Sequence, residues 1–303
     1  MKTFIGKIII AVTLLVFGCS SSNIFLSEGI KNYEAGNMQI AIDNFTKAVS
    51  VDPSDPQVYL NRGKAYSKLL QHQNAINDYS KAIQLNPNLY QAYINRGIEL
   101  VLKSDLKKAL PDLDTAVRLN SGDPNAFFSR GYCLGRLGQF DRAIADYNKA
   151  LELNPKMEEV YVNRGNLKAE NDDHLGAIND FTSAIELDST DINAFINRGT
   201  DKGIIGDYQG AIEDFSSAIN LNPTDKELYL LRGEAKIMLN DYSGAIVDYS
   251  HIIKLDPHNA QAFYKRGLTL LVMKKKKDAC ENLKKAGSLG YIDAYEAIKK
   301  NCR

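Results

Sequence analysis

The chain has 303 residues, of which 44% are hydrophobic, and it carries 37 basic and 37 acidic side chains. Because neither charge is in excess, the composition gives no indication of a nucleic-acid partner or of a polyanionic substrate. No shift in composition marks a boundary between separate cores, so a single elongated architecture is expected.

The first predicted element is an apolar run at residues 8–17, which follows Lys2 and Lys7. A run of ten residues is too short to cross a bilayer, and a short apolar run after basic residues is typical of a secretory signal. Residues 16–19, Val-Phe-Gly-Cys, then resemble the lipobox of bacterial lipoproteins. This resemblance implies that Cys19 is acylated with fatty acid such as palmitate and anchors the mature chain in a membrane. The alternative is an uncleaved signal anchor, and both interpretations place the rest of the chain outside the cytoplasm.

An Arg-Gly dipeptide recurs every 34 residues through the rest of the chain. Its arginines are Arg62, Arg96, Arg130, Arg164, Arg198, Arg232 and Arg266, and Gly29 lies one period further upstream. Twelve residues after each glycine stands an alanine, sixteen after it a large apolar residue, and nineteen after it usually another alanine. These positions share one face of a helix, and the small residues allow another helix to approach it closely.

Proline stands 24 residues after five of these glycines, where it can end one helix and begin a turn. The five are Pro53, Pro87, Pro155, Pro223 and Pro257. Each repeat is therefore predicted to be two helices joined by a turn. The glycine, which has no Cβ, is predicted to let the second helix lie against the first.

Residues at the spacing of the tetratricopeptide signature are Tyr59, Gly63, Tyr66, Ala75, Tyr79, Ala82 and Pro87. The chain thus resembles the tetratricopeptide repeat family over nearly all of its mature length. The resemblance implies an all-α, right-handed superhelical solenoid of about eight 34-residue helix-turn-helix repeats with a C-terminal capping helix. The first helices of the repeats would line a concave groove.

The expected divisions begin with a signal peptide at residues 1–18 and a lipidated N-terminus with a short tether at 19–22. Eight repeats follow within residues 22–291, at about 22–55, 56–89, 90–123, 124–157, 158–191, 192–225, 226–259 and 260–291. A capping helix is expected at 292–303.

Six aspartates stand fifteen residues after the repeat glycines: Asp78, Asp112, Asp146, Asp180, Asp214 and Asp248. The arginines from Arg62 to Arg232 and these aspartates are predicted to form structural ion pairs where helices pack, because a buried charge needs a partner. Two registers remain open. Asp78 can meet Arg62 of its own repeat or Arg96 of the next.

Polar residues stand two positions before successive glycines, in a column that lines the groove in related proteins: Asn61, Asn95, Ser129, Asn163 and Asn197. A carboxamide both donates and accepts hydrogen bonds, so such a ladder can hold an extended peptide by its backbone. The alternative is that these amides only satisfy neighbouring polar groups.

The resemblance implies a membrane-anchored scaffold or adaptor that binds peptide segments or proteins in the groove. The alternative, by analogy of fold, is an accessory or regulatory subunit of a cell-envelope assembly machine for pili, outer-membrane proteins or polysaccharide export. The expected location is the bacterial cell envelope, facing the periplasm or the exterior.

The C-terminal end is basic, since residues 265–303 hold eleven basic and four acidic side chains, a net charge of +7, against −9 for residues 20–264. Lys274 to Lys277 suit the polar outer face of a terminal repeat. They also allow contact with anionic lipid headgroups or with an acidic partner. In an oxidising compartment Cys280 and Cys302 can form a disulfide, although connectivity does not follow from sequence, and Cys133 is expected to be a small packed residue.

Catalytic chemistry is not expected. The four histidines, His72, His174, His251 and His258, lack the spacing of a metal site. His72 and His174 occupy the same turn position of different repeats, which favours a structural role. No phosphate-binding glycine loop or nucleophile elbow is present, so neither an enzyme activity nor a cofactor is predicted.

Overall fold

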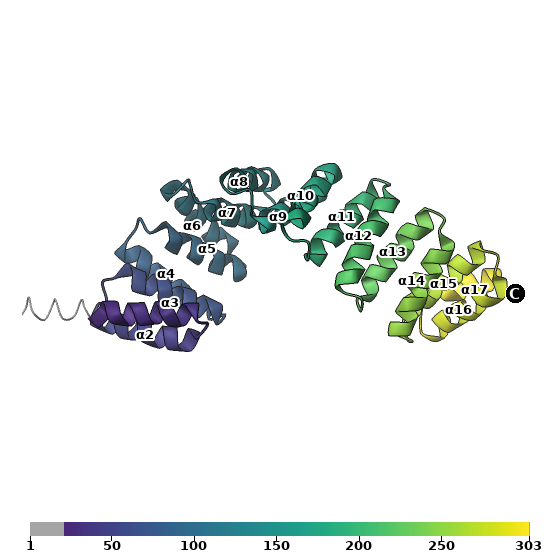
Figure 1. Cartoon of the computed structure of the whole chain (residues 1–303), viewed down its shortest axis with the longest axis horizontal. Helices are drawn as coiled ribbons and strands as arrows, with labels where there is room; N and C mark the ends of the chain where they lie inside the picture. The colour runs from purple at the N-terminus through teal and green to yellow at the C-terminus, as the bar shows by residue number, and fades with distance from the viewer. Residues whose placement is uncertain (1–20, 303) are drawn as a thin grey trace, which may run out of the picture. The chain divides into compact units, whose positions relative to one another are not determined.

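The computed structural model describes residues 21–302, and within that range it is built of helices and turns without a strand (Figure 1). A helical stretch over residues 21–34 comes first. The helices that follow are α2 (Met38–Val51), α3 (Pro56–Lys68), α4 (His72–Leu85), α5 (Tyr90–Leu102), α6 (Leu106–Leu119), α7 (Pro124–Arg136), α8 (Phe140–Leu153), α9 (Glu158–Glu170), α10 (His174–Leu187), α11 (Ile192–Ile204), α12 (Tyr208–Leu221), α13 (Lys226–Met238), α14 (Tyr242–Leu255), α15 (Ala260–Val272), α16 (Lys276–Ser288) and α17 (Ile292–Asn301). The predicted all-α helix-turn-helix repeat fold is confirmed.

Local sequence explains where the helices begin and end. The carboxylate of Asp55 accepts a hydrogen bond from the Gln57 backbone amide, and Pro56 occupies the first turn of α3, where no amide hydrogen is needed. Each turn inside a hairpin contains a residue in the left-handed region seven positions after the repeat glycine. That residue is glycine at Gly36, but it is Leu70 in the next repeat, with a φ of 57°.

The repeat glycines are the points of closest approach inside each hairpin. A Cβ on Gly63 would lie 2.6 Å from the ring of Tyr79, and a Cβ on Gly97 would lie 2.7 Å from Leu113. No real Cβ contact is that short, so the large side chain of the second helix fills the space that the glycine leaves. The predicted role of the glycine column is confirmed.

Contacts divide the chain into two compact units, Met1–Pro155 and Lys156–Arg303. In unit 1 the described core contains the fully buried side chains of Phe45, Tyr79, Leu113 and Tyr147, each flanked by buried alanines. In unit 2 the corresponding core residues are Phe181, Phe215, Tyr249 and Leu283, each at most 4% exposed. Composition gives no sign of this division, because the 34-residue pattern continues through residue 155 without a break.

The predicted signal peptide and Cys19 lie outside the described residues, so their assignment remains a prediction. Among residues 21–302, none of the helices has both the length and the apolar character needed to cross a membrane.

Candidate functional site

Each predicted arginine pairs with the aspartate of its own repeat. Arg62 donates from Nε and Nη2 to the two carboxylate oxygens of Asp78, both at 2.8 Å. The same two-bond geometry, with distances between 2.6 and 3.1 Å, joins Arg96 to Asp112, Arg130 to Asp146, Arg164 to Asp180, Arg198 to Asp214 and Arg232 to Asp248. The structure thereby decides between the two registers that the sequence left open.

The remaining guanidinium nitrogen connects neighbouring repeats within a unit, which the sequence analysis missed. Arg96 Nη1 donates to Ser80 Oγ of the preceding repeat at 3.0 Å, and Arg198 Nη1 donates to Thr182 Oγ1 at 3.1 Å. The Arg96 guanidinium also lies 5.9 Å from the ring centroid of Tyr93, three residues earlier in α5. The arginine column therefore stabilises both the pairing of helices within a hairpin and the contact between successive hairpins.

The last arginine shows what the aspartate contributes. Arg266 Nε donates to the neutral amide oxygen of Asn282 at 2.8 Å, and burial lowers the pKa of Arg266. For Arg62, the hydrogen bond with Asp78 outweighs burial and raises the pKa of the guanidinium. These residues serve packing, and nothing in their geometry presents a free charge to a ligand.

Unit 2 adds a second cation to each aspartate. Lys168, Lys202 and Lys236 place Nζ 2.8, 2.9 and 2.8 Å from the carboxylates of Asp180, Asp214 and Asp248. These lysines all stand three residues after the repeat glycine, a position that is Tyr66, Leu100 and Leu134 in unit 1. The ammonium groups of these lysines are therefore paired with buried aspartates and are unavailable as free surface charges.

The predicted asparagine column lies on a recurring surface of the first helices. Positions two before, one after and five after the repeat glycine fall on one face of a helix, and we call this surface the first-helix stripe. Its members are Asn61, Lys64, Lys68, Asn95, Ile98, Leu102, Ser129, Tyr132 and Arg136 in unit 1, and Asn163, Asn166, Glu170, Asn197, Thr200, Ile204, Leu231, Glu234, Met238, Lys265, Leu268 and Val272 in unit 2.

The asparagines of the stripe do not behave alike. Asn163 Nδ2 donates to the Glu159 carbonyl at 2.7 Å, and Asn197 Nδ2 donates to Asn166 Oδ1 at 2.9 Å, so both amides satisfy neighbouring groups. Asn61 and Asn95 are half-buried, and within the described residues neither side chain takes part in a hydrogen bond. Ser129 is buried, with 7% of its surface exposed. The amides available to a ligand are thus those of Asn61 and Asn95.

Two of the four histidines, His72 and His174, pair with buried carboxylates that were not predicted. His72 Nδ1 lies 2.6 Å from Glu99 Oε2, and His174 Nδ1 lies 2.8 Å from Asp201 Oδ1. Glu99 is 1% exposed and Asp201 is 4% exposed. Burial raises the pKa of Asp201, while the hydrogen bond from His174 opposes that shift.

Both pairs span 27 residues and join the second helix of one repeat to the first helix of the next. The signal was present in the sequence, because each of these turn histidines is followed 27 residues later by an acid. Among residues 21–302, no three histidine, cysteine or acidic side chains are grouped as a metal site would require.

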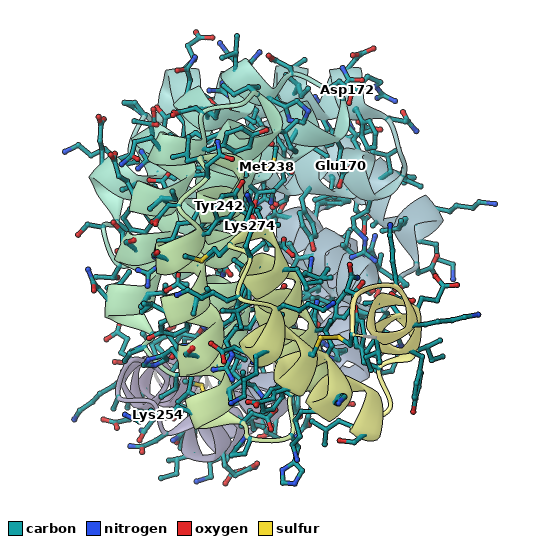
Figure 2. The ribbon with its side chains drawn as sticks, turned by 90° about the vertical axis from the view of Figure 1, so that its right-hand side faces the viewer. Glu170, Asp172, Met238, Tyr242, Lys254 and Lys274 are labelled. Atoms are coloured by element: carbon teal, nitrogen blue, oxygen red, sulfur yellow. A yellow bond between two sulfur atoms is a disulfide. The ribbon has the colours of Figure 1, made fainter. Side chains whose placement is uncertain are left out.

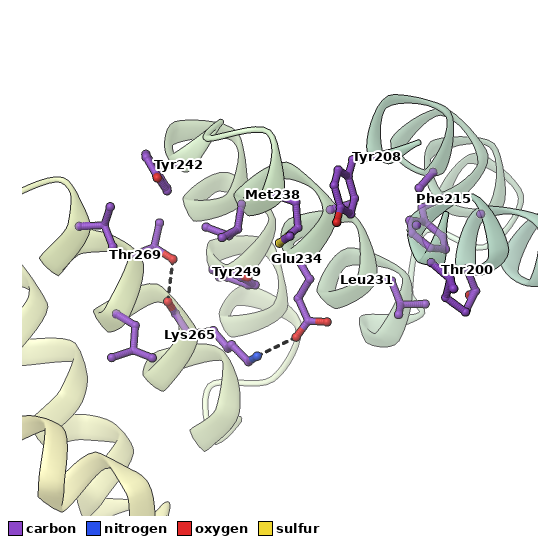
Figure 3. Close-up of a pocket in the computed structure, with 18 residues that line it drawn as sticks. Thr200, Tyr208, Phe215, Leu231, Glu234, Met238, Tyr242, Tyr249, Lys265 and Thr269 are labelled. Carbon is purple, nitrogen blue, oxygen red and sulfur yellow. Dashed lines mark hydrogen bonds and ion pairs between the residues drawn. The ribbon is translucent and has the colours of Figure 1, made fainter. Parts of the chain in front are cut away.

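An apolar groove opens in unit 2 between α11, α13 and α15, with a volume of about 660 Å³ (Figure 3). The first-helix stripe supplies much of its lining, including Ile204, Met238 and Val272, which are 59%, 56% and 57% exposed. Ala235 and Thr269 also line it, at the position that holds Glu99 and Asp201 in other repeats.

No single column of the repeat predicts this groove. Its signal is the unbroken run of apolar residues five positions after Gly199, Gly233 and Gly267, a column that holds Lys68, Leu102 and Arg136 in unit 1. Leu231 similarly replaces asparagine in the column two before the glycine.

The C-terminal cap is α17, fastened to α16 by a disulfide between Cys280 and Cys302 (Figure 2). The rings of Tyr264 and Tyr291 stack with centroids 4.6 Å apart, and the Tyr295 hydroxyl donates to the Gly287 carbonyl at 2.9 Å. Cys133 is a buried free cysteine, and burial raises the pKa of its thiol. Lys274 to Lys277 form an exposed run between α15 and the body of α16.

Comparison with known protein families gives two matches. A family model described as tetratricopeptide repeat matches residues 56–89 and 124–157, and a model described as TPR repeat matches residues 31–69. None of the curated proteins matches the chain.

Several solved structures are similar to the chain. A tetratricopeptide repeat protein from Parabacteroides merdae has a TM-score of 0.54 at 22% identity, covering 82% of this chain and 99% of that one. The C-terminal part of a TPR repeat-containing protein from Cytophaga hutchinsonii has a TM-score of 0.64 at 19% identity, with coverages of 79% and 98%. YrrB, described as a TPR protein with an unusual peptide-binding site, has a TM-score of 0.52 at 26% identity, with coverages of 63% and 97%.

Proposed function

Because this chain is a tetratricopeptide repeat protein, whose fold is typical of protein–protein interaction scaffolds, we propose that it binds extended peptide segments along the first-helix stripe of unit 1. One observation carries the proposal. Asn61 and Asn95 lie one repeat apart on the stripe with both donor and acceptor unused, so they can pair with the backbone of a strand laid across α3 and α5. The similarity to YrrB, which is described as binding a peptide, supports this function.

A pull-down from native membranes with the full chain tests the proposal. The variant N61A/N95A removes the two free carboxamides, and N74A/N77A is its matched control on the exposed side of α4. We expect N61A/N95A to lose a partner that the wild type and the control retain. Retention of every partner by N61A/N95A would contradict the proposal.

We further propose that the scaffold is held at a membrane of the bacterial cell envelope through acylated Cys19, facing the periplasm or the exterior. The lipobox-like residues 16–19 support this proposal. Palmitate labelling in a bacterial host tests it. The wild-type chain is expected to incorporate label and sediment with membranes, and C19A to do neither; equal labelling of C19A would contradict the proposal.

A further inference from the structure

The first-helix stripe changes its chemistry along unit 2, and this change concerns the partner. At α11, α13 and α15 the position five after the glycine is Ile204, Met238 and Val272, so each helix exposes one large apolar side chain to the groove. Exposed apolar side chains gathered in one concavity are typical of a binding site. In unit 1 the corresponding positions are Lys68, Leu102 and Arg136, so a single apolar residue there stands between two basic ones.

Most polar side chains that line the groove already have partners within the chain. Thr200 Oγ1 donates to the Ile196 carbonyl at 2.8 Å, and Thr269 Oγ1 donates to the Lys265 carbonyl at 2.8 Å. Lys265 Nζ lies 2.7 Å from Glu234 Oε1, and Figure 3 shows this pair beside the apolar lining.

An extended peptide would therefore bury backbone amides and carbonyls in this groove with few partners for them. An α-helix satisfies its own backbone and presents only side chains, so the groove suits a helical segment better than a strand.

The charge beside the groove indicates which side chains a bound helix would carry. Two residues beyond Val272 begins the exposed run of Lys274, Lys275 and Lys277, and no ion pair engages these three lysines within the described residues. A basic edge at one end of an apolar groove complements a ligand that carries acidic side chains at the corresponding end.

We infer that the groove between α11, α13 and α15 binds an amphipathic helix of the partner, with its apolar face on Ile204, Met238 and Val272 and its acidic end over the lysine run. This inference rests on the proposed scaffold function and names a second kind of segment that the scaffold recognises. The stripe of unit 1 takes an extended segment, and the groove of unit 2 takes a helical one.

Peptide display on the full chain tests the inference. A library of random 16-residue peptides is selected on the wild-type chain and counter-selected on M238E, in which a charge enters the groove at a side chain that is 56% exposed. Enriched peptides are expected to carry apolar residues three and four positions apart and acids towards one end. They are expected to bind M238E at least tenfold more weakly than wild type.

V247E is the matched control, since Val247 is 65% exposed on α14 and does not line the groove. It should bind the selected peptides as wild type does, and circular dichroism should show equal helix content in both variants. The variant K274E/K275E/K277E is expected to bind the acidic peptides at least threefold more weakly, with the difference shrinking at high salt.

Three results would overturn the inference. They are enrichment of proline-containing or strictly alternating peptides, no enrichment against M238E, and lysine variants that lose only binding to vesicles of anionic lipid. The proposed function fails separately. If N61A/N95A loses a native partner while M238E binds every selected peptide normally, the extended-peptide function stands and the helix site does not.

Discussion

Each partly buried arginine of the repeat contacts three neighbours at once. Arg96 binds both oxygens of Asp112, donates to Ser80 of the preceding repeat and lies beside the ring of Tyr93. The two bonds to one carboxylate fix the plane of the guanidinium, which lets the third nitrogen reach the next hairpin. A lysine at this position would lack that fixed geometry.

Removing the carboxylate should be costly where it is buried. Asp112 is 10% exposed and Arg96 is 23% exposed, so D112A leaves a charge without its partner and should lower the free energy of unfolding by about 3 to 5 kcal/mol. E152A breaks a pair whose carboxylate is 68% exposed and should cost at most about 0.5 kcal/mol. Urea denaturation measures both, and equal losses would contradict a structural role for the arginine column.

Glu158 gives unit 2 a pH-dependent stability. Burial, a hydrogen bond with Asp191 and nearby acids raise the pKa of Glu158 from 4.5 to about 7. The native state therefore binds a proton more tightly than the unfolded chain, so this contribution to stability is full below about pH 4.5 and is lost as the pH rises through about 7.

E158Q should remove this part of the pH dependence, and E186Q, at an exposed position of α10, should keep it. Thermal unfolding between pH 4 and 8 provides the measurement. Superimposable pH profiles for wild type and E158Q would show that Glu158 does not titrate in this way.

At the scale of the helix, close approach at the glycine column is what makes a hairpin. The helix α11 contains two glycines one turn apart that separate the effects of packing and of helix propensity. A Cβ on Gly199 would lie 2.9 Å from the Phe215 ring, whereas a Cβ on Gly203 would have no neighbour within 4 Å.

G199A is accordingly expected to destabilise the chain by about 1 to 3 kcal/mol through overpacking. G203A is expected to stabilise it by up to about 1 kcal/mol, because alanine favours the helix. Denaturant titration of the two variants distinguishes these effects. A stabilising G199A would mean that a Cβ fits between α11 and the Phe215 ring without overpacking.

The disulfide between Cys280 and Cys302 links the end of α17 to α16. C302S opens a loop of 22 residues and should lower the stability of the cap by about 3 kcal/mol. Hydrogen exchange is expected to quicken in α16 and α17 while amides of α3 to α7 stay as protected as in wild type, because repeat proteins depend mainly on neighbouring repeats. Unchanged exchange in α17 would show that packing of residues such as Ala294 holds the cap without the bond.

At the scale of the whole molecule, the fold follows closely from the sequence because one packing rule is repeated. The spacing of Gly63, Ala75, Tyr79 and Ala82 demands two helices in close contact, and the same spacing of glycine, alanine and a large apolar residue recurs in every repeat, usually with the second alanine. Family models match only some of the repeats, but the described helices follow the period throughout.

The candidate sites follow from the sequence only in part. The asparagine column could be predicted, but the columns alone could not separate Asn95 from Asn197, because the difference is whether a neighbour such as Asn166 reaches the amide. The groove depends on several columns of the repeat at once, because Ala235 and Thr269 are small while Met238 is exposed. No single column predicts this combination. The register of the arginine–aspartate pairs and the shape of the groove both depend on how the helices pack, so they do not follow from the residue columns alone.

Site-specific photo-crosslinking in living cells can show whether a partner contacts the first-helix stripe. A benzophenone amino acid replaces Asn61, on the first-helix stripe, or Asn77, on the exposed side of α4, in the full chain. We expect a partner protein to be crosslinked from position 61 and not from position 77. Crosslinking from position 77 with none from position 61 would contradict this expectation, because the partner would then contact the second helices.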